Sequence, residues 1–492
     1  MSFDTQHDSP PPVQGTYDLL LVGTGFASAF FLHRYLKHAA RGARVLVLER
    51  GEQRSQQWHV QNYEALRLES LATFVNRSEW KPWEPRIAFG GGSNCWWACT
   101  PRMLPEDFRL RSKYGVGRDW PVTYDDLESY YGDAEDIMAV SGPSDGSPYP
   151  RSRPYPLPPH RFSDPDRFFK RWFPDQFFQQ PTARPSRALP SGRPRCEANG
   201  VCRTCPIDSK FTIHNELAHL FKDPRVTLCT GANVKRLDVA GNTVRGVHYT
   251  HAGVDRIARA DVVGLGANAI FNPALLLRSG VADGGAGRGL GEQVSLHVDV
   301  MLKGMNSFQG STSITGLGYM LYAGEHRRER AGALMEVWNV PVLRSERGRW
   351  RERVGLKFIY EDLPQPDNRV TVDAADGDRP IVEFGARSEY AERGMAALES
   401  DLPRVLAALP VERYEIEKRT IETESHIMCT SPMGRNPADS VVDDGLVHHR
   451  IRNLLVLGSS VFPTAAPANP TLTITALSLR AADKLFASRR TG

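Results

Sequence analysis

The sequence lacks a long uninterrupted hydrophobic run. The longest apolar stretch, residues 19–32, is interrupted by glycines and is shorter than the ~20 residues that a transmembrane helix needs. The N-terminus also lacks a basic region followed by an apolar one, so no targeting segment is predicted, and residues 1–14 are interpreted as a flexible leader. We therefore expect a cytoplasmic protein with no membrane span.

Neither sign of charge is in large excess, and cysteines are few. The 61 Lys and Arg residues against 57 Asp and Glu give a net charge of +4, which argues against nucleic acid as the main partner. The seven cysteines are an odd number in a chain without a signal segment, which argues against a disulfide framework. The length of 492 residues predicts about two or three domains.

A nucleotide-binding turn is predicted near the start of the chain. An apolar strand, residues 19–22, is followed by Gly23, Gly25 and Ser28, where Ser28 stands in place of the third glycine of the G-x-G-x-x-G pattern. Gly23 permits the tight turn, Gly25 allows a pyrophosphate to approach the helix N-terminus, and Ser28 allows close helix–strand packing. The next predicted strand ends in Glu49, the usual place of an acidic residue that binds a ribose hydroxyl. The pattern predicts an adenine dinucleotide without separating FAD from NAD.

Later segments alternate between the patterns of strands and helices. Residues 88–108 are glycine-rich and predict a second loop at the cofactor, and residues 226–253 read as β-structure around a Gly-Asn turn. Residues 260–280 read as a buried strand, a glycine and a helix, which indicates a parallel sheet. Residues 300–420 read as antiparallel strands and a helix over residues 388–409.

The final 70 residues again show the sequence of strand, glycine turn and helix that is predicted near the start of the chain. Residues 453–464 read as an apolar strand with a Gly-Ser turn, and the helix after it is predicted to have Asn469 as N-cap and Pro470 in its first position. The fold class is therefore α/β, a doubly wound domain built from discontinuous segments with an inserted antiparallel α+β domain. We expect the first unit to span residues 15–110, 195–300 and 425–490, and the inserted unit to span residues 111–194 and 301–424.

One histidine, His426, lies in the mostly uncharged stretch SHIMCTSPMG, residues 425–434. No metal-ligand partner follows it at helical spacing. A core histidine satisfied by the backbone and a catalytic base are both compatible with this stretch.

The chain resembles the glucose–methanol–choline (GMC) oxidoreductases, FAD enzymes that oxidise alcohols. The resemblance rests on LLLVGTGFASA…VLVLERG, GGGSNCWWACTPR, WPVTYDDLESYY, GLGANAIFNPALLLRSG and the C-terminal SHIMCTSPMG…NPTLTITALSLRAAD, in that order over residues 19–483. It is greatest to the sugar-oxidising branch of pyranose oxidases, C-glycoside oxidases and FAD sugar dehydrogenase large subunits. It implies an FAD-binding Rossmann-like domain with an inserted substrate-binding domain.

The resemblance also implies roles for particular residues. The family's two active-site residues map to His426 and Asn469. His426 would be the base that takes the hydroxyl proton as hydride moves to flavin N5, and Asn469 would hold the same oxygen. For FAD, the resemblance assigns Gly23, Gly25, Ser28, Glu49, Gly91, Gly92, Ser93, Asn94, Val234, Gly458, Ser459, Asn469, Pro470 and Thr471.

Two features depart from the simplest form of that family. Cys95 stands where some pyranose oxidases carry a histidine bonded to FAD; we expect non-covalent FAD, with a thioether at Cys95 as the alternative. Cys196, Cys202 and Cys205 resemble the segment that ligates an iron–sulfur cluster in membrane-associated sugar dehydrogenases, so a cluster is a conditional expectation, against a loop of reduced or zinc-binding cysteines.

The expected activity is FAD-dependent oxidation of a CH–OH group of a sugar, glycoside or amino-sugar. The electron acceptor would be oxygen, a quinone or a partner protein. The alternatives are a flavin-containing lyase on the same fold and an iron–sulfur-containing sugar dehydrogenase subunit.

Overall fold

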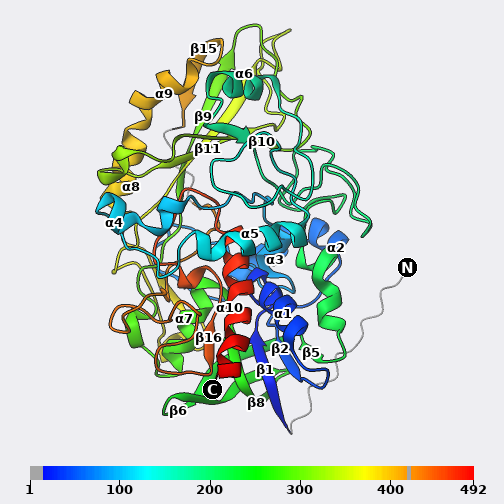
Figure 1. Ribbon diagram of the computed structural model, residues 1–492, viewed down its shortest axis with the longest axis vertical. Helices are drawn as coiled ribbons and strands as arrows, with labels where there is room; N and C mark the ends of the chain where they lie inside the picture. The colour runs from blue at the N-terminus through cyan, green and yellow to red at the C-terminus, as the bar shows by residue number, and fades with distance from the viewer. Residues whose placement is uncertain (1–14, 418–422, 492) are drawn as a thin grey trace.

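The computed structural model describes residues 15–417 and 423–491 (Figure 1). The predicted leader, residues 1–14, lies outside the described residues. The helices are α1 (Phe26–His38), α2 (Gln56–Gln61), α3 (Tyr63–Leu71), α4 (Leu110–Tyr114), α5 (Asp125–Met138), α6 (Asp164–Trp172), α7 (Asn268–Arg278), α8 (Glu389–Ala396), α9 (Leu398–Leu406) and α10 (Thr471–Thr491).

The first sheet is mainly parallel, and its strand order is β5-β2-β1-β8-β7-β6, with β16 also paired to β8. β1, β2, β5, β8 and β16 run parallel, whereas β6 and β7 are antiparallel neighbours. Its strands are β1 (Thr16–Val22), β2 (Val45–Leu48), β5 (Val226–Cys229), β6 (Ala232–Ala240), β7 (Thr243–His251), β8 (Val254–Leu265) and β16 (Leu454–Val456). The α/β fold class with a doubly wound parallel sheet is confirmed.

Helices from both ends of the chain cover this sheet. The strand cores are fully buried, as their continuous apolar runs predict for a parallel sheet. α1 and α10 pack against each other, and α5 packs on α10, where the Tyr131 hydroxyl lies 2.8 Å from Thr473 Oγ1. In the lower half of Figure 1, the red C-terminal helix therefore lies beside the blue N-terminal elements.

The second sheet is antiparallel and has the strand order β15-β9-β12-β11-β10-β4, in the upper part of Figure 1. Alternate side chains of its central strands point to opposite faces. One face carries the register row Val298, Leu356 and Val337, which belongs to the apolar core shared with α8 and α9. Its strands are β4 (Phe177–Gln179), β9 (Val294–Leu302), β10 (Ile314–Leu321), β11 (Ala333–Trp338), β12 (Arg353–Tyr360) and β15 (Val411–Ile416).

Several predicted boundaries differ from the observed ones. The predicted division at residue 300 falls inside β9, a strand of the second sheet, because its hydrogen-bonded neighbours are β12 and β15. The helix predicted over residues 388–409 is two helices, α8 and α9, which meet at Ala397. The strands that sequence predicts near residues 369–384 form a small separate sheet of β13 (Arg369–Thr371), β14 (Ile381–Glu383) and β3 (Val75–Asn76).

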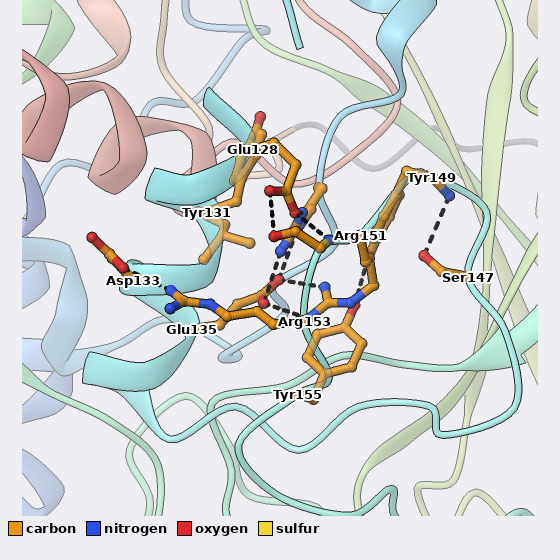
Figure 2. Close-up of polar contacts among 12 residues, drawn as sticks. Glu128, Tyr131, Asp133, Glu135, Ser147, Tyr149, Arg151, Arg153 and Tyr155 are labelled. Carbon is orange, nitrogen blue, oxygen red and sulfur yellow. Dashed lines mark hydrogen bonds and ion pairs between the residues drawn. The ribbon is translucent and has the colours of Figure 1, made fainter. Parts of the chain in front are cut away.

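The loop-rich stretch after α5 is fixed by a buried ionic network (Figure 2). Glu135 of α5 accepts hydrogen bonds from Arg102 Nε (2.8 Å) and Arg151 Nη2 (2.7 Å). The Arg151 guanidinium stacks 3.5 Å from the ring centre of Tyr155, whose hydroxyl lies 2.7 Å from that of Tyr149. Side-chain contacts rather than regular secondary structure therefore hold this loop against α5.

Loss of Arg102 should destabilise the protein much more than loss of the more exposed Arg153 of the loop after α5. Arg102 is fully buried, so Arg102→Met leaves the Glu135 carboxylate short of a partner at a cost of about 3–5 kcal/mol. Arg153 forms a partly exposed pair with Asp133, so the matched variant Arg153→Met should cost at most about 1 kcal/mol. Urea unfolding followed by circular dichroism measures both. Equal losses in the two variants would contradict the role given to Arg102.

Candidate active site

The predicted nucleotide-binding turn lies between β1 and α1. Gly23 has φ +91°, and a Cβ there would lie 2.6 Å from the carbonyl oxygen of Gly266. Gly25 precedes the first turn of α1, no side chain caps that helix end, and a Cβ on Gly25 would meet no protein atom within 4 Å. The unpaired N–H groups of a helix N-terminus bind anions, so this open end suits a pyrophosphate.

Glu49 lies at the end of β2, as predicted, but other protein groups already occupy its carboxylate. Oε2 accepts hydrogen bonds from the Thr24 N–H (2.9 Å) and hydroxyl (2.7 Å), and Oε1 accepts one from the Gly51 N–H (2.7 Å). Burial raises the pKa of Glu49, and these hydrogen bonds oppose that rise. Glu49 therefore fixes the Thr24 turn, and any ribose contact would use its remaining acceptor capacity.

Three of the predicted cofactor residues shape the walls of the site without lining it. Ser28 packs so closely under β8 that a Cβ on Gly266 would lie 2.0 Å from Ser28 Oγ. Ser93 Oγ donates to the Gly90 carbonyl oxygen (2.7 Å), and Asn94 Nδ2 donates to the Phe89 carbonyl oxygen (2.8 Å). These bonds hold the glycine loop in its tight conformation.

A single cavity of about 440 Å³ brings the remaining predicted residues together. It runs between the nucleotide-binding turn of the first sheet and one face of the second sheet. The predicted residues that line it are Gly23, Gly25, Glu49, Gly91, Gly92, Val234, His426, Gly458, Ser459, Asn469, Pro470 and Thr471.

Backbone hydrogen bonds hold the His426 segment on both sides. Met428 exchanges hydrogen bonds with Gly291, with its N–H 2.9 Å from the Gly291 carbonyl oxygen. The Cys429 N–H donates to the carbonyl oxygen of Ser459 (3.0 Å), and Ser459 Oγ donates to the carbonyl oxygen of Ile427 (2.6 Å). The backbone that carries His426 is thus held between the segment before β9 and the turn after β16.

The hydrogen bonds of Gln293 decide which nitrogen of His426 carries the proton. Gln293 Nε2 donates to the carbonyl oxygens of Ala466 and Ala468, so Gln293 Oε1 is the atom that faces His426 Nδ1, at 2.5 Å. An amide oxygen can only accept, so His426 Nδ1 must donate. Nε2 then keeps its lone pair, and within residues 15–417 and 423–491 it has no hydrogen-bond partner.

Burial lowers the pKa of His426 to about 4, although the neighbouring Glu424 carboxylate opposes that shift. Glu424 itself accepts a hydrogen bond from Lys357 Nζ (2.5 Å) and one from Ser295 Oγ. The imidazole is therefore neutral at ordinary pH, with its lone pair available. The arrangement can take a proton from a hydroxyl group placed in the cavity.

Asn469 does not act as the predicted N-cap. α10 begins at Thr471, and the side-chain oxygen of Asn469 is buried without a hydrogen-bond partner in the described part of the chain. Such an unpaired buried oxygen is costly unless a ligand completes it. Because Asn469 lines the cavity beside the start of α10, its amide is free to bind a molecule held there.

These features fit FAD. The open N-terminus of α1 and the bare glycine at position 25 suit the pyrophosphate, and the second helix N-terminus, at Thr471, suits an electron-rich ring. The unpaired oxygen of Asn469 gives the cavity a polar group that awaits a partner.

The cysteines do not converge in the manner of metal ligands. In the residues that the structure describes, no group of three or more His, Cys, Asp or Glu side chains is arranged to hold a metal ion. Cys196, Cys202 and Cys205 each contact a different polar neighbour, respectively Thr312, Arg184 and Ser209. Cys95 lines the cavity, as its predicted position beside FAD requires.

Sequence reasoning missed the residues that the second sheet contributes. Gln293, His297, Glu336, Trp338 and Lys357 reach the site from β9, β11 and β12 or just before them. The one available signal was polar residues at alternate positions of apolar strands, in ALMEVW and RVGLKFIY. Which of those polar faces would meet His426 depended on strand register, which the sequence pattern left open.

Comparison with known proteins agrees with this site. Residues 364–478 match the family model described as GMC oxidoreductase. The chain is 26% identical to the fructose dehydrogenase large subunit of Gluconobacter japonicus, covering 96% of this chain and 98% of that protein. It is 26% identical to paromamine 6'-oxidase of Streptomyces fradiae, covering 95% and 90%. Pyridoxine 4-oxidase from Mesorbium loti has the same fold, with a TM-score of 0.67 at 19% identity over 96% of this chain and 99% of that one.

The family-model match and these relatives identify an oxidoreductase that acts on alcohol groups. Within that class, residues 364–478 match the GMC oxidoreductase family model, and the similar proteins over nearly the whole chain are a sugar dehydrogenase subunit and a paromamine oxidase. In the described residues, no helix combines the length and apolar character that crossing a membrane would require.

Replacing the neutral amide beside His426 by a carboxylate should raise the pKa of that histidine. Gln293→Glu places a negative charge at the Nδ1–H, which favours the imidazolium and should raise the pKa by about one unit or more from its value of about 4. NMR of histidine-labelled protein measures it, with the His426 signal identified by its loss in His426→Ala. The exposed Gln176→Glu is the matched control and should leave the signal unmoved. An unchanged pKa in Gln293→Glu would contradict the hydrogen bond assigned here.

Proposed function

We propose that the protein oxidises a CH–OH group of a sugar, glycoside or amino-sugar to a carbonyl, with FAD as its cofactor and His426 as the base. The observation that carries the proposal is the neutral His426 imidazole, fixed by Gln293 with its Nε2 lone pair free in the cavity that holds the nucleotide-binding turn. The relatives named as a fructose dehydrogenase subunit and a paromamine oxidase support sugars and amino-sugars as the substrate class.

The residues of the chain divide the work of alcohol oxidation. FAD, when bound, accepts the hydride. His426 Nε2 takes the hydroxyl proton, and the Glu424 carboxylate nearby stabilises the positive charge that the imidazole gains. The Asn469 amide Nδ2 would donate to the substrate oxygen, and its unpaired Oδ1 would accept from another group in the cavity. Gln293 keeps the ring oriented by holding the Nδ1 proton.

We further propose that FAD is bound non-covalently through Gly23, Gly25, Gly91, Gly92, Gly458 and Thr471, with Glu49 and Val234 at its ADP end. Ser28, Ser93 and Asn94 would act indirectly, by holding the loops that contact it. The separate partners of Cys196, Cys202 and Cys205 favour a flavin-only protein over one with an iron–sulfur cluster.

His426→Ala should abolish most flavin reduction while keeping FAD bound. A general base contributes about 10²–10⁴-fold to a rate, so the anaerobic bleaching of the flavin by an active sugar should slow by about that factor. Stopped-flow mixing with a panel of sugars, glycosides and aminoglycosides measures it. His219→Ala, at an exposed histidine, is the control. A variant with the wild-type rate would remove His426 from its role, and cleavage of substrate by the wild type without bleaching would favour a lyase instead.

Acid precipitation of the purified protein should give a yellow supernatant and a colourless pellet, because no covalent bond retains the flavin. Metal analysis of the same sample should find no stoichiometric iron. A yellow pellet that becomes colourless in Cys95→Ser would establish the thioether, and iron bound in proportion to protein would establish the cluster.

A further inference from the structure

The second sheet turns a row of polar side chains toward the cavity. Glu336 of β11 lies opposite Lys357 of β12, and Lys357 lies opposite His297 of β9. All three line the cavity, on the face opposite the one that packs against α8 and α9. This face therefore forms the wall across from the nucleotide-binding turn and is placed to meet the substrate.

Aromatic rings flank this row. Trp338 lies two residues after Glu336 on the same face of β11 and also lines the cavity. Its ring lies 4.9 Å from that of Trp97 and 5.5 Å from that of His297, measured between ring centroids. The polar row thus has an aromatic border that suits either the CH surface of a sugar ring or a cation.

Glu336 does not form an ion pair with Lys357, the residue opposite it on the neighbouring strand. Opposite charges in register on neighbouring strands ordinarily pair. Lys357, however, turns its ammonium to Glu424, at 2.5 Å. In the described part of the chain, Glu336 forms no ion pair, and its side chain receives a hydrogen bond from Trp338 Nε1 at 3.2 Å. Glu336 is nevertheless 2% exposed, and a buried carboxylate without a cation is costly.

The side chains around Glu336 include more carboxylates than cations. Burial lowers the pKa of both His297 and His426 to about 4, so neither adds positive charge near neutral pH. Burial raises the pKa of Glu336, and the nearby charges of Lys357 and Arg184 oppose that rise. Arg184 does not line the cavity, and its guanidinium donates to Thr182, Cys202 and Gln180. At this end of the cavity the lining groups are therefore two carboxylates against the single ammonium of Lys357.

We propose that Glu336 is a specificity-determining residue that receives a protonated amino group of the substrate. The inference rests on the proposed sugar oxidation and narrows it to amino-sugars. A substrate ammonium would supply the cation that Glu336 lacks, and charged hydrogen bonds of this kind are stronger than neutral ones. The faces of Trp97 and Trp338 would add cation–π attraction. A neutral sugar hydroxyl could donate to Glu336 but would leave its charge uncompensated.

The test compares sugars that differ in one substituent. The probes are D-glucosamine, D-glucose and N-acetyl-D-glucosamine, each measured with the FAD-loaded enzyme by anaerobic flavin reduction and by the change in flavin absorbance on binding. The variants are Glu336→Gln, which removes the charge, and Glu336→Asp, which keeps it. Glu399→Gln, at an exposed carboxylate of α9, is the matched control.

We expect the wild type to favour D-glucosamine over both neutral sugars, and Glu336→Gln to lower that preference by at least about tenfold. The neutral sugars should respond little to the same substitution, while Glu336→Asp and Glu399→Gln should keep the preference for the amine. Equal responses to charged and neutral probes in the wild type, or an unchanged preference in Glu336→Gln, would overturn the inference. If sugars reduce the flavin but D-glucosamine is not preferred, the inference about Glu336 fails and the proposed sugar oxidation stands. If D-glucosamine binds preferentially but no sugar reduces the flavin, the proposed sugar oxidation fails and the binding role of Glu336 stands.

Discussion

The geometry of the active site depends on the side chain of Gln293. Its amide nitrogen donates to the carbonyl oxygens of Ala466 and Ala468, and its oxygen accepts the proton of His426 Nδ1. One amide therefore fixes the tautomer of the histidine and the backbone that leads to Asn469. Because Gln293 lies directly before β9, the same side chain ties both proposed active-site residues, His426 and Asn469, to the second sheet.

The two sheets contribute different chemistry to one cavity. The first sheet supplies open helix ends and bare glycines, which favour an anionic, extended cofactor. The second sheet supplies side chains on one face, with carboxylates, a lysine and aromatic rings in register. The first set uses backbone groups, which tolerate little variation, whereas the second can change residue by residue without altering the fold. If the proposed function holds, this division separates the binding of the cofactor from the choice of substrate.

The cofactor half could be predicted from the sequence because its signals are local. Gly23, Gly25 and Glu49 follow from a strand, a turn and a second strand that are contiguous in the chain. Asn469 was predicted to line the site, but its assignment as an N-cap failed because α10 starts at Thr471 and the side chain remains unpaired. The positions of Glu336 and Lys357 depend on pairing across 21 residues, and that of Gln293 on a contact across 133. No local pattern encodes such registers.

The packing of α1 against α10 has a consequence for how the protein is made. His38 Nε2 lies 2.7 Å from Asp483 Oδ1, a contact between residues 445 positions apart. During synthesis the first sheet must wait for β16 and α10, so its early strands leave the ribosome long before their covering helix exists. His426 and Asn469 also emerge in this late segment. A nascent chain would thus present its nucleotide-binding turn well before its C-terminal segment is made. A chaperone that shields exposed apolar strands would act throughout that interval.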